Sequence, residues 1–276
     1  MNRLPIDKRA QIIGMLVEGM SMRSVSRLVG CSINTVTKLL EEVGFACNLY
    51  QSQHLRNLQS KRIQIDEIWA FCYSKEKNVA PRDKGVLGHG DVWTYTAIDA
   101  DTKLMVSYMV GKRDADYALA FMTDVYGRLA NRVQLTTDGH APYLNAVPDA
   151  FGTDVDYAML VKHYGAPASQ NDQRRYSPAQ LLGTEQKAIT GNPDMSKVST
   201  SYVERQNLTM RMSMRRFTRL TNGFSKKVEN LEHAVSLHFM HYNFARIHKT
   251  LRVTPAMEAG VSDHVWSLEE IAALAS

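Results

Sequence analysis

Three carboxylates and a run of arginines are the residues of this chain whose types and spacing point to chemistry. Asp66 interrupts RIQIDEIWAFCY, a stretch of β-forming residues, and Asp138 ends a second such stretch, RVQLTTDG. Glu204 lies among arginines in SYVERQNLTMRMSMRRF. A charged side chain in a buried strand is costly unless it is paired or bound to a metal ion. Each carboxylate alone has an ordinary structural explanation, so the hypothesis depends on their combination.

The residues around Glu204 predict a helix with a narrow polar face. At 3.6 residues per turn, positions three and seven apart differ by about 60° and about 20°, so Glu204, Asn207 and Arg211 share one face. An adjoining apolar stripe would pack the helix onto a sheet. The stripe consists of Val203, Met210, Met214 and Phe217. We expect the polar face to border the sheet where Asp66 and Asp138 emerge.

Three converging carboxylates would raise one another's pKa unless a cation were present. Oxygen ligands suit Mg²⁺ or Mn²⁺, and two such ions about 4 Å apart clamp the attacking and leaving oxygens of a phosphodiester. We therefore expect Asp66 to bridge two ions, with Asp138 and Glu204 each holding one. Asn207 would order a ligand or a water, and Arg211 would hold a phosphate. The nucleophile would be water in a cutting step and a DNA 3′-hydroxyl in a joining step.

Other ionisable residues near these positions are expected to be structural. Glu67 follows Asp66 directly, and strand alternation places it on the opposite sheet face. His140 follows Asp138 closely, and a turn or capping role is favoured over substrate contact. Four further histidines are expected to lie on a helix with apolar neighbours and without matching carboxylates, so we expect them to pack: His233, His238, His241 and His248.

Positive charge is concentrated beside the predicted helix. The 276 residues carry a net charge of +5, while residues 201–252 contain ten Lys or Arg against three Asp or Glu, a difference of +7. Such density favours phosphate contacts over a solvated face. The residues expected to contact phosphates are Arg205, Arg215, Arg216 and Arg219.

Residues 63–250 predict one α/β domain that would position these groups. The expected elements are strands within 62–73 and 92–111 (the latter a hairpin turning at residues 99–101), a helix at 114–131, a strand at 132–139, a helix at 141–151 and a strand at 154–165. This order is that of a ribonuclease H-like mixed sheet flanked by helices. Residues 74–91 are expected to form a loop, and residues 166–199 are polar and irregular.

Residues 1–45 predict a helix-turn-helix module. Ser21 and Ser32 can cap two short helices around a turn at Gly30, and Gly44 can end the second helix. The polar residues of the second helix can reach base edges and phosphates in a major groove. They are Asn34, Thr35, Thr37 and Lys38. The alternative is a plain three-helix bundle that packs on the main domain.

The remaining segments are read as a linker at 46–62 and a helical extension at 251–276. Three widely spaced cysteines without a C-x-x-C pair argue against structural zinc. No apolar run approaches eighteen residues, and the N-terminus lacks the apolar region of a signal peptide. We therefore expect a cytoplasmic protein without a membrane partner.

Several stretches resemble DDE transposases of the insertion sequence 1 family, within the retroviral-integrase superfamily. They span roughly residues 60–265 and are QIDEIWAF, AIDADTKLMVSYMVGKR, TTDGHAPY, the run from SYVERQNL to HYNF, and HKTLRVTPAMEAG. The most specific part is the E-x-x-N-x-x-x-R pattern followed by FSKKVENLE and HYNF. In this family pattern Asp66, Asp138 and Glu204 match the catalytic triad, and Asn207 and Arg211 match accessory positions.

The resemblance implies a ribonuclease H-like fold, metal-dependent strand cleavage and transfer, and recognition of an element's terminal inverted repeats as well as target DNA. It also implies a homodimer or higher assembly, associated with the nucleoid of a bacterium or archaeon. The chain lacks the cysteine zinc motif that many members carry ahead of the helix-turn-helix. Two alternatives remain open: a catalytically inert helix-turn-helix regulator derived from a transposase, and a structure-selective nuclease without transfer activity.

Overall fold

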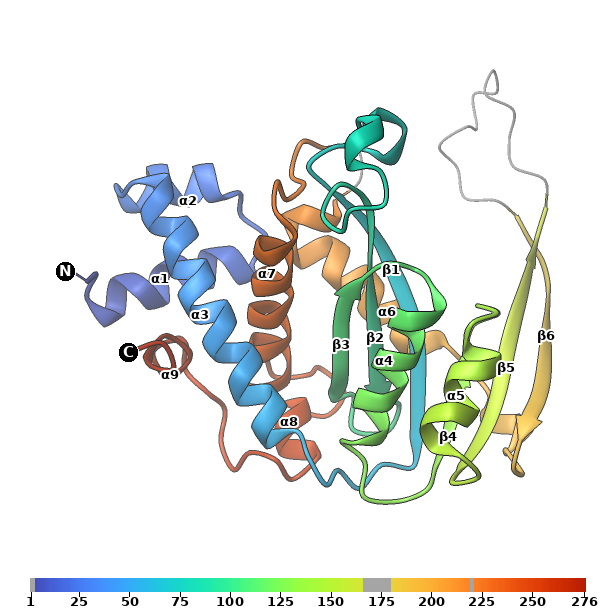
Figure 1. The fold of residues 1–276 in the computed structure, drawn as a ribbon. Coiled ribbons are helices and arrows are strands. Elements are labelled where there is room, and N and C mark those ends of the chain that lie inside the picture. The colour runs from blue at the N-terminus through green and yellow to red at the C-terminus, as the bar shows by residue number, and fades with distance from the viewer. Residues whose placement is uncertain (1–2, 166–179, 219–220) are drawn as a thin grey trace.

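A six-stranded mixed sheet forms the centre of the protein (Figure 1). The computed structural model describes residues 3–165, 180–218 and 221–276. The strands are β1 (Arg62–Cys72), β2 (Gly90–Asp99), β3 (Met105–Gly111), β4 (Val133–Thr137), β5 (Val155–Tyr164) and β6 (Leu181–Thr190). Their order is β3-β2-β1-β4-β5-β6. β1 to β3 are antiparallel, β4 and β5 run parallel to β1, and β6 is antiparallel to β5. This is the predicted ribonuclease H-like arrangement, with β6 added at one edge.

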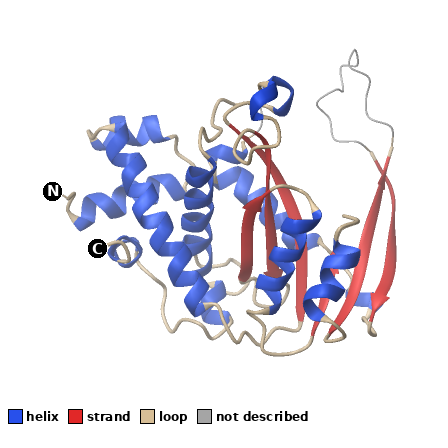
Figure 2. Ribbon diagram, viewed as in Figure 1, coloured by secondary structure: helices blue, strands red, loops and turns tan. Residues whose placement is uncertain are grey.

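Helices cover both faces of the sheet and extend beyond the β3 edge (Figures 1 and 2). They are α1 (Ile6–Val17), α2 (Met22–Val29), α3 (Ile33–His54), α4 (Ala115–Tyr126), α5 (Tyr143–Phe151), α6 (Ser201–Ser213), α7 (Val228–Met240), α8 (Pro255–Glu258) and α9 (Leu268–Ala273). In the view of Figure 1, α4 and α5 lie in front of the sheet and α6 lies behind it. None of the described helices combines the length and apolar character needed to span a membrane.

The N-terminal helices begin as predicted, but the third is longer. The Ser21 and Ser32 side chains cap α2 and α3, and Gly30 has a left-handed φ of 68°. The prediction that Gly44 ends the helix is wrong, because α3 continues to His54 through half of the expected linker. A Cβ atom at Gly44 would lie 2.5 Å from the Cβ of His233 on α7. Gly44 therefore permits a close crossing of α3 and α7.

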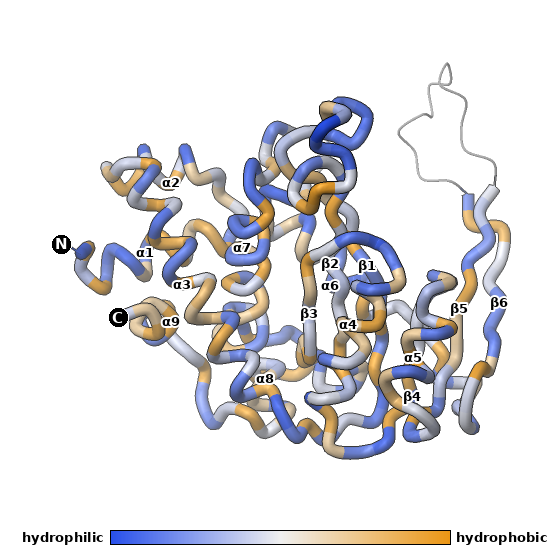
Figure 3. Tube along the Cα trace, viewed as in Figure 1, coloured by the Kyte–Doolittle hydropathy of each residue, from blue (hydrophilic) through white to orange (hydrophobic). Residues whose placement is uncertain are grey.

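The segment predicted as irregular contains a strand. β6 pairs with β5 over most of its length, and the first eight of its ten residues are exposed. It is largely hydrophilic or neutral in Figure 3. Without a buried face, its sequence shows no alternation of apolar and polar residues. Residues 166–179, the rest of this prediction, lie outside the described residues.

The C-terminal segment returns to the N-terminal helices. Thr254 caps α8, and Ser267 forms the predicted capping box with Glu270 at the start of α9. Arg9 of α1 donates a hydrogen bond of 2.7 Å to the carbonyl of Ala272. The two ends of the chain are thereby joined beside α3 (Figure 1).

Candidate active site

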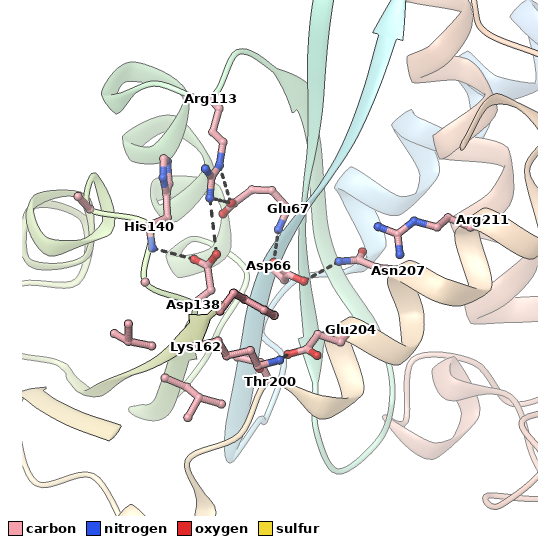
Figure 4. A pocket seen from close by; sticks show the side chains of 15 residues that line it. Asp66, Glu67, Arg113, Asp138, His140, Lys162, Thr200, Glu204, Asn207 and Arg211 are labelled. Atoms are coloured by element: carbon pink, nitrogen blue, oxygen red, sulfur yellow. Dashed lines mark hydrogen bonds and ion pairs between the residues drawn. The ribbon is translucent and has the colours of Figure 1, made fainter. Parts of the chain in front are cut away.

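An open cavity of about 740 Å³ gathers the three predicted carboxylates (Figure 4). β1 and β4 are parallel neighbours, and Ile65 pairs with Thr137. The next residue of each chain segment is an aspartate, so Asp66 and Asp138 emerge side by side. Glu204 reaches the same cavity from α6.

A buried glutamine of β1 holds the start of α6 in place. The Oε1 atom of Gln64 accepts hydrogen bonds from the backbone amides of Tyr202 (2.9 Å) and Val203 (3.2 Å). Thr200, the residue before α6, supplies no side-chain cap. Gln64 therefore satisfies orphan amides of the first turn and ties α6 to the strand that carries Asp66. Sequence reasoning missed it, because a lone glutamine in a strand carries no distinctive signal.

The predicted polar face of α6 lines the cavity. Asn207 Nδ2 donates to Asp66 Oδ2 at 2.8 Å, and the backbone amide of Glu67 donates to Asp66 Oδ1 at 2.9 Å. The Oδ1 atom of Asn207 is buried and finds no hydrogen-bond partner among the described residues. Arg211 also lines the cavity. The apolar stripe of Val203, Met210, Met214 and Phe217 is buried, as expected.

Glu67 joins the cluster, although its side chain points to the other sheet face. Its carboxylate accepts a hydrogen bond from the Tyr143 hydroxyl of α5, which is the direction that strand alternation predicts. β4 ends at Thr137, so beyond this residue β1 has no β4 neighbour. Side chains from the two faces of the sheet can therefore approach each other beside Asp66 and Glu67. Single oxygens of Asp66, Glu67 and Asp138 consequently lie within 4.8 Å of one another. Glu67 therefore points to the predicted face and also belongs to the carboxylate cluster, while its structural role stays a prediction.

Burial and mutual repulsion disfavour the charged forms of two of these carboxylates. Burial, followed by the charge of Asp138, raises the pKa of Asp66 to about 7, against hydrogen bonds from Glu67 N and Asn207. The same two causes raise the pKa of Glu67 to about 7, opposed by Tyr143 and Arg113.

Two cations that the sequence did not single out neutralise part of this charge. Arg113 lies 3.0 Å from Glu67 Oε2 and 3.6 Å from Asp138 Oδ2, and its guanidinium lies 4.7 Å from the Trp93 ring. Lys162 of β5 pairs with Glu204, which also accepts a hydrogen bond from Thr200. Their proximity follows from strand order, so no local pattern could have identified them.

The donor set fits a divalent cation. Three carboxylate oxygens converge in a partly buried cavity, where unshielded negative charge is unfavourable. Oxygen ligands of this kind suit Mg²⁺ or Mn²⁺. Glu204 lines the same cavity, held in its present position by Lys162 and Thr200. His140 takes a turn position, since its backbone amide donates to Asp138 Oδ1 at 3.0 Å.

The predicted DNA contacts differ in accessibility. Asn34 and Lys38 of α3 are exposed, whereas Thr35 and Thr37 are half-buried. Arg205 and Arg215 are exposed as well.

Arg216 is half-buried. Its Nε donates to Ser225 Oγ at 2.7 Å, and burial lowers its pKa to about 10. Its contact with DNA stays a prediction. Arg219 lies outside the described residues.

The strand order, with one aspartate within β1 and another directly after β4, defines a ribonuclease H-like α/β protein. No protein-family model matches the chain, and no curated protein matches it. Among solved structures, the chain is similar to a Mos1 transposase paired-end complex with the left transposon end, at 12% identity over 57% of this chain and 60% of that chain, with a TM-score of 0.26. The chain thus spans less than two thirds of that protein.

Two further similarities are to transposase complexes. A Mos1 mariner paired-end complex with Mn matches at 10% identity over 87% of this chain and 76% of that chain, with a TM-score of 0.30. A piggyBac transposase synaptic complex with hairpin DNA matches at 11% identity over 98% of this chain and 69% of that chain, with a TM-score of 0.45.

Proposed function

We propose that this protein is a DDE-type DNA transposase of the insertion sequence 1 kind, which cuts at the ends of a mobile element and joins the 3′-hydroxyl to target DNA. The supporting observation is the placement of Asp66, Asp138 and Glu204 around one open cavity. The same cavity has Asn207 and Arg211 in its wall, which completes the set expected from the sequence. Terminal inverted repeats and target DNA would be the partners of a homodimer or higher assembly in the cytoplasm.

Asp66, Asp138 and Glu204 would hold two Mg²⁺ or Mn²⁺ ions, with Asp66 shared. Bound ions of this kind neutralise charge on the scissile phosphate and activate the attacking oxygen. Asn207 orients the Asp66 carboxylate through its 2.8 Å hydrogen bond. Arg113 holds Glu67 and Asp138 in place, and Arg211 would contact a phosphate oxygen.

The test is cleavage of duplexes that carry the DNA flanking the gene, with Mg²⁺ or Mn²⁺ present. Asp66→Asn, Asp138→Asn and Glu204→Gln should each reduce nicking by at least about 100-fold, since removal of even outer partners of metal ligands costs about 10- to 100-fold. Each variant should still bind the ends. Normal cutting by Glu204→Gln would show that the site is assigned wrongly.

The same assay separates the alternatives. An inert regulator would bind the ends and leave them uncut under every metal condition. A nuclease without transfer activity would cut but would fail to join pre-cleaved ends to a target plasmid. A transposase performs both steps, and gel analysis of labelled ends distinguishes the products.

A further inference from the structure

A second cavity, of about 270 Å³, lies on the flank of α6 opposite the carboxylate cavity. At about 100° per residue, Thr200, Glu204, Asn207 and Arg211 project to one side of the helix. Tyr202, Arg205 and Thr209, which line the second cavity, project about 180° away. The exposed ridge between the two flanks carries Arg205, Leu208 and Met212. We call the second cavity the cationic groove.

The cationic groove collects four positively charged side chains in its wall. Its cations are Lys103 from the β2–β3 turn, Arg205 from α6, and Arg246 and Lys249 from the segment after α7. Of the described residues that line it, none is acidic. None of the four cations forms an ion pair within 4.0 Å with a described carboxylate, whereas Arg62, Arg113, Arg128 and Arg132 all do.

The local field and the fixed geometry of Lys103 both suit a bound anion. Burial, then the charges of Lys103 and Arg246, lower the pKa of His248 in the same groove. The Lys103 ammonium lies 3.9 Å from the centroid of the Tyr202 ring and donates to the carbonyl of Asp101 at 3.2 Å. The Tyr242 hydroxyl donates to the Lys103 carbonyl at 3.0 Å. The lysine is therefore held at the groove before any ligand arrives.

We propose that the cationic groove binds the sugar-phosphate backbone of the DNA whose scissile strand enters the carboxylate cavity. This inference rests on the proposed function for the identity of that DNA. An α-helix is about 10–12 Å across, close to the width of about 12 Å of the major groove of B-DNA. A duplex lying over the α6 ridge therefore presents phosphates to both flanks, one at the carboxylates and one at the four cations.

The experiment measures DNA binding rather than cutting. The triple variant Lys103→Gln/Arg246→Gln/Lys249→Gln is made in an Asp66→Asn background, and Arg205 is left intact because it adjoins Glu204. Fluorescence anisotropy with a 40-base-pair duplex that carries the DNA flanking the gene gives the dissociation constant across a salt series. The logarithm of the association constant decreases linearly with the logarithm of the salt concentration. We expect this slope to become less steep by about 3, since each lost phosphate contact reduces its magnitude by about 0.9.

A charge-matched control carries Lys61→Gln/Lys84→Gln/Lys197→Gln in the same background. These lysines are exposed and lie on separate segments, so the slope should stay unchanged. Acetylation of the Asp66→Asn protein, followed by mass spectrometry, supplies a readout without groove substitutions. DNA should protect Lys103 and Lys249 and leave Lys61, Lys84 and Lys197 reactive.

An unchanged slope in the groove variant, or full reactivity of Lys103 and Lys249 in the complex, would overturn the proposal. Either result leaves the proposed function standing if the wild-type protein cuts the ends. Conversely, a wild-type protein that binds DNA through the groove but cuts nothing would refute the proposed function alone.

Discussion

Asp66 and Glu67 occupy surroundings that disfavour their charged forms. Both are mostly shielded from water, and the charge of Asp138 adds to the effect of burial, so the pKa of each rises to about 7. Arg113 offsets part of this charge on the Glu67 side. Among the described residues, the hydrogen-bond donors to the Asp66 carboxylate are neutral, namely the amide of Glu67 and the side chain of Asn207. A divalent cation would supply the missing positive charge.

The pH dependence of metal-free stability follows from these raised pKa values. Between about pH 4 and pH 7 the folded protein binds more protons than the unfolded chain, so the free energy of unfolding should decrease as pH rises through this window. The slope is at most about 1.4 kcal/mol per pH unit for each group. Urea unfolding in EDTA should show this fall, and Asp66→Asn should flatten it.

Addition of Mg²⁺ provides the matching control. The ion should raise the midpoint of unfolding more at pH 8 than at pH 5, because the raised pKa of Asp66 leaves this ligand mostly protonated at the lower pH. Equal shifts at both pH values, or an equal shift in Asp66→Asn, would contradict a metal site at Asp66.

At the scale of elements, α6 is positioned by one side-chain oxygen and one apolar stripe. Gln64 accepts two amide hydrogen bonds from the first turn of α6, while Val203 and Met210 are fully buried. The carboxylate cavity and the cationic groove lie on the two flanks of the same helix. The tie between β1 and α6 therefore sets the distance between Asp66 and Glu204.

Gln64→Leu should disturb the site without touching it. The variant leaves two amides of the first turn unsatisfied, which costs about 1–3 kcal/mol in unfolding free energy. Cleavage should fall further than the stability loss alone explains, because the helix that carries Glu204 is no longer hydrogen-bonded to β1.

Gln64→Glu keeps an acceptor at the same position and is the matched control. It should retain more cleavage than Gln64→Leu when both are assayed well below their unfolding midpoints. Equal activity of Gln64→Leu and the wild type would show that α6 holds its position without this bond.

At the scale of the whole molecule, α3 of the N-terminal helices packs against α7, which lies beside the sheet. Gly44 of α3 lies against His233 of α7, and α9 is bonded back to α1 through Arg9. The helix-turn-helix function and the division into domains remain predictions. The contact of α3 with α7 would connect any DNA bound by α3 to the rest of the fold.

His238 lies where α7 meets the N-terminal helices, a contact region that we call the junction. It is buried on α7, lines a small cavity with Leu16, Leu40 and Met214, and neither ring nitrogen finds a partner among the described residues. Burial, then the charges of His241 and Arg246, lower its pKa to about 3. The side chain is therefore neutral in the folded protein at physiological pH.

Acid should consequently destabilise the junction. Below pH 6.5 the unfolded chain binds a proton that folded His238 does not, so this residue contributes a loss of up to about 2 kcal/mol in unfolding free energy between pH 7 and pH 5. The contribution is opposite in sign to that of Asp66 and Glu67 and is measured as a difference between two proteins. The unfolding free energy of wild type minus that of His238→Leu should fall by up to about 2 kcal/mol over this range in urea unfolding, and a difference that does not change with pH would contradict the prediction.

Local spacing was sufficient to predict much of this molecule. The caps at Ser21, Ser32 and Ser267, the strand that carries Asp66, and the shared face of Glu204, Asn207 and Arg211 follow from neighbours one to seven residues apart. Side chains alternate between the two faces of a strand every 2 residues and return to the same face of a helix every 3.6 residues. The relative position of such close neighbours is therefore set locally and does not depend on the rest of the chain.

Tertiary structure alone decided the rest. A glycine that ends a helix and one that admits a neighbouring helix look alike in sequence, so the role of Gly44 depended on α7. The exposed strand β6 has no buried face to impose a pattern. Glu67, Arg113 and Lys162 meet the carboxylates, and four cations meet beside α6, because strand order and register bring distant segments together, and no local repeat encodes that proximity.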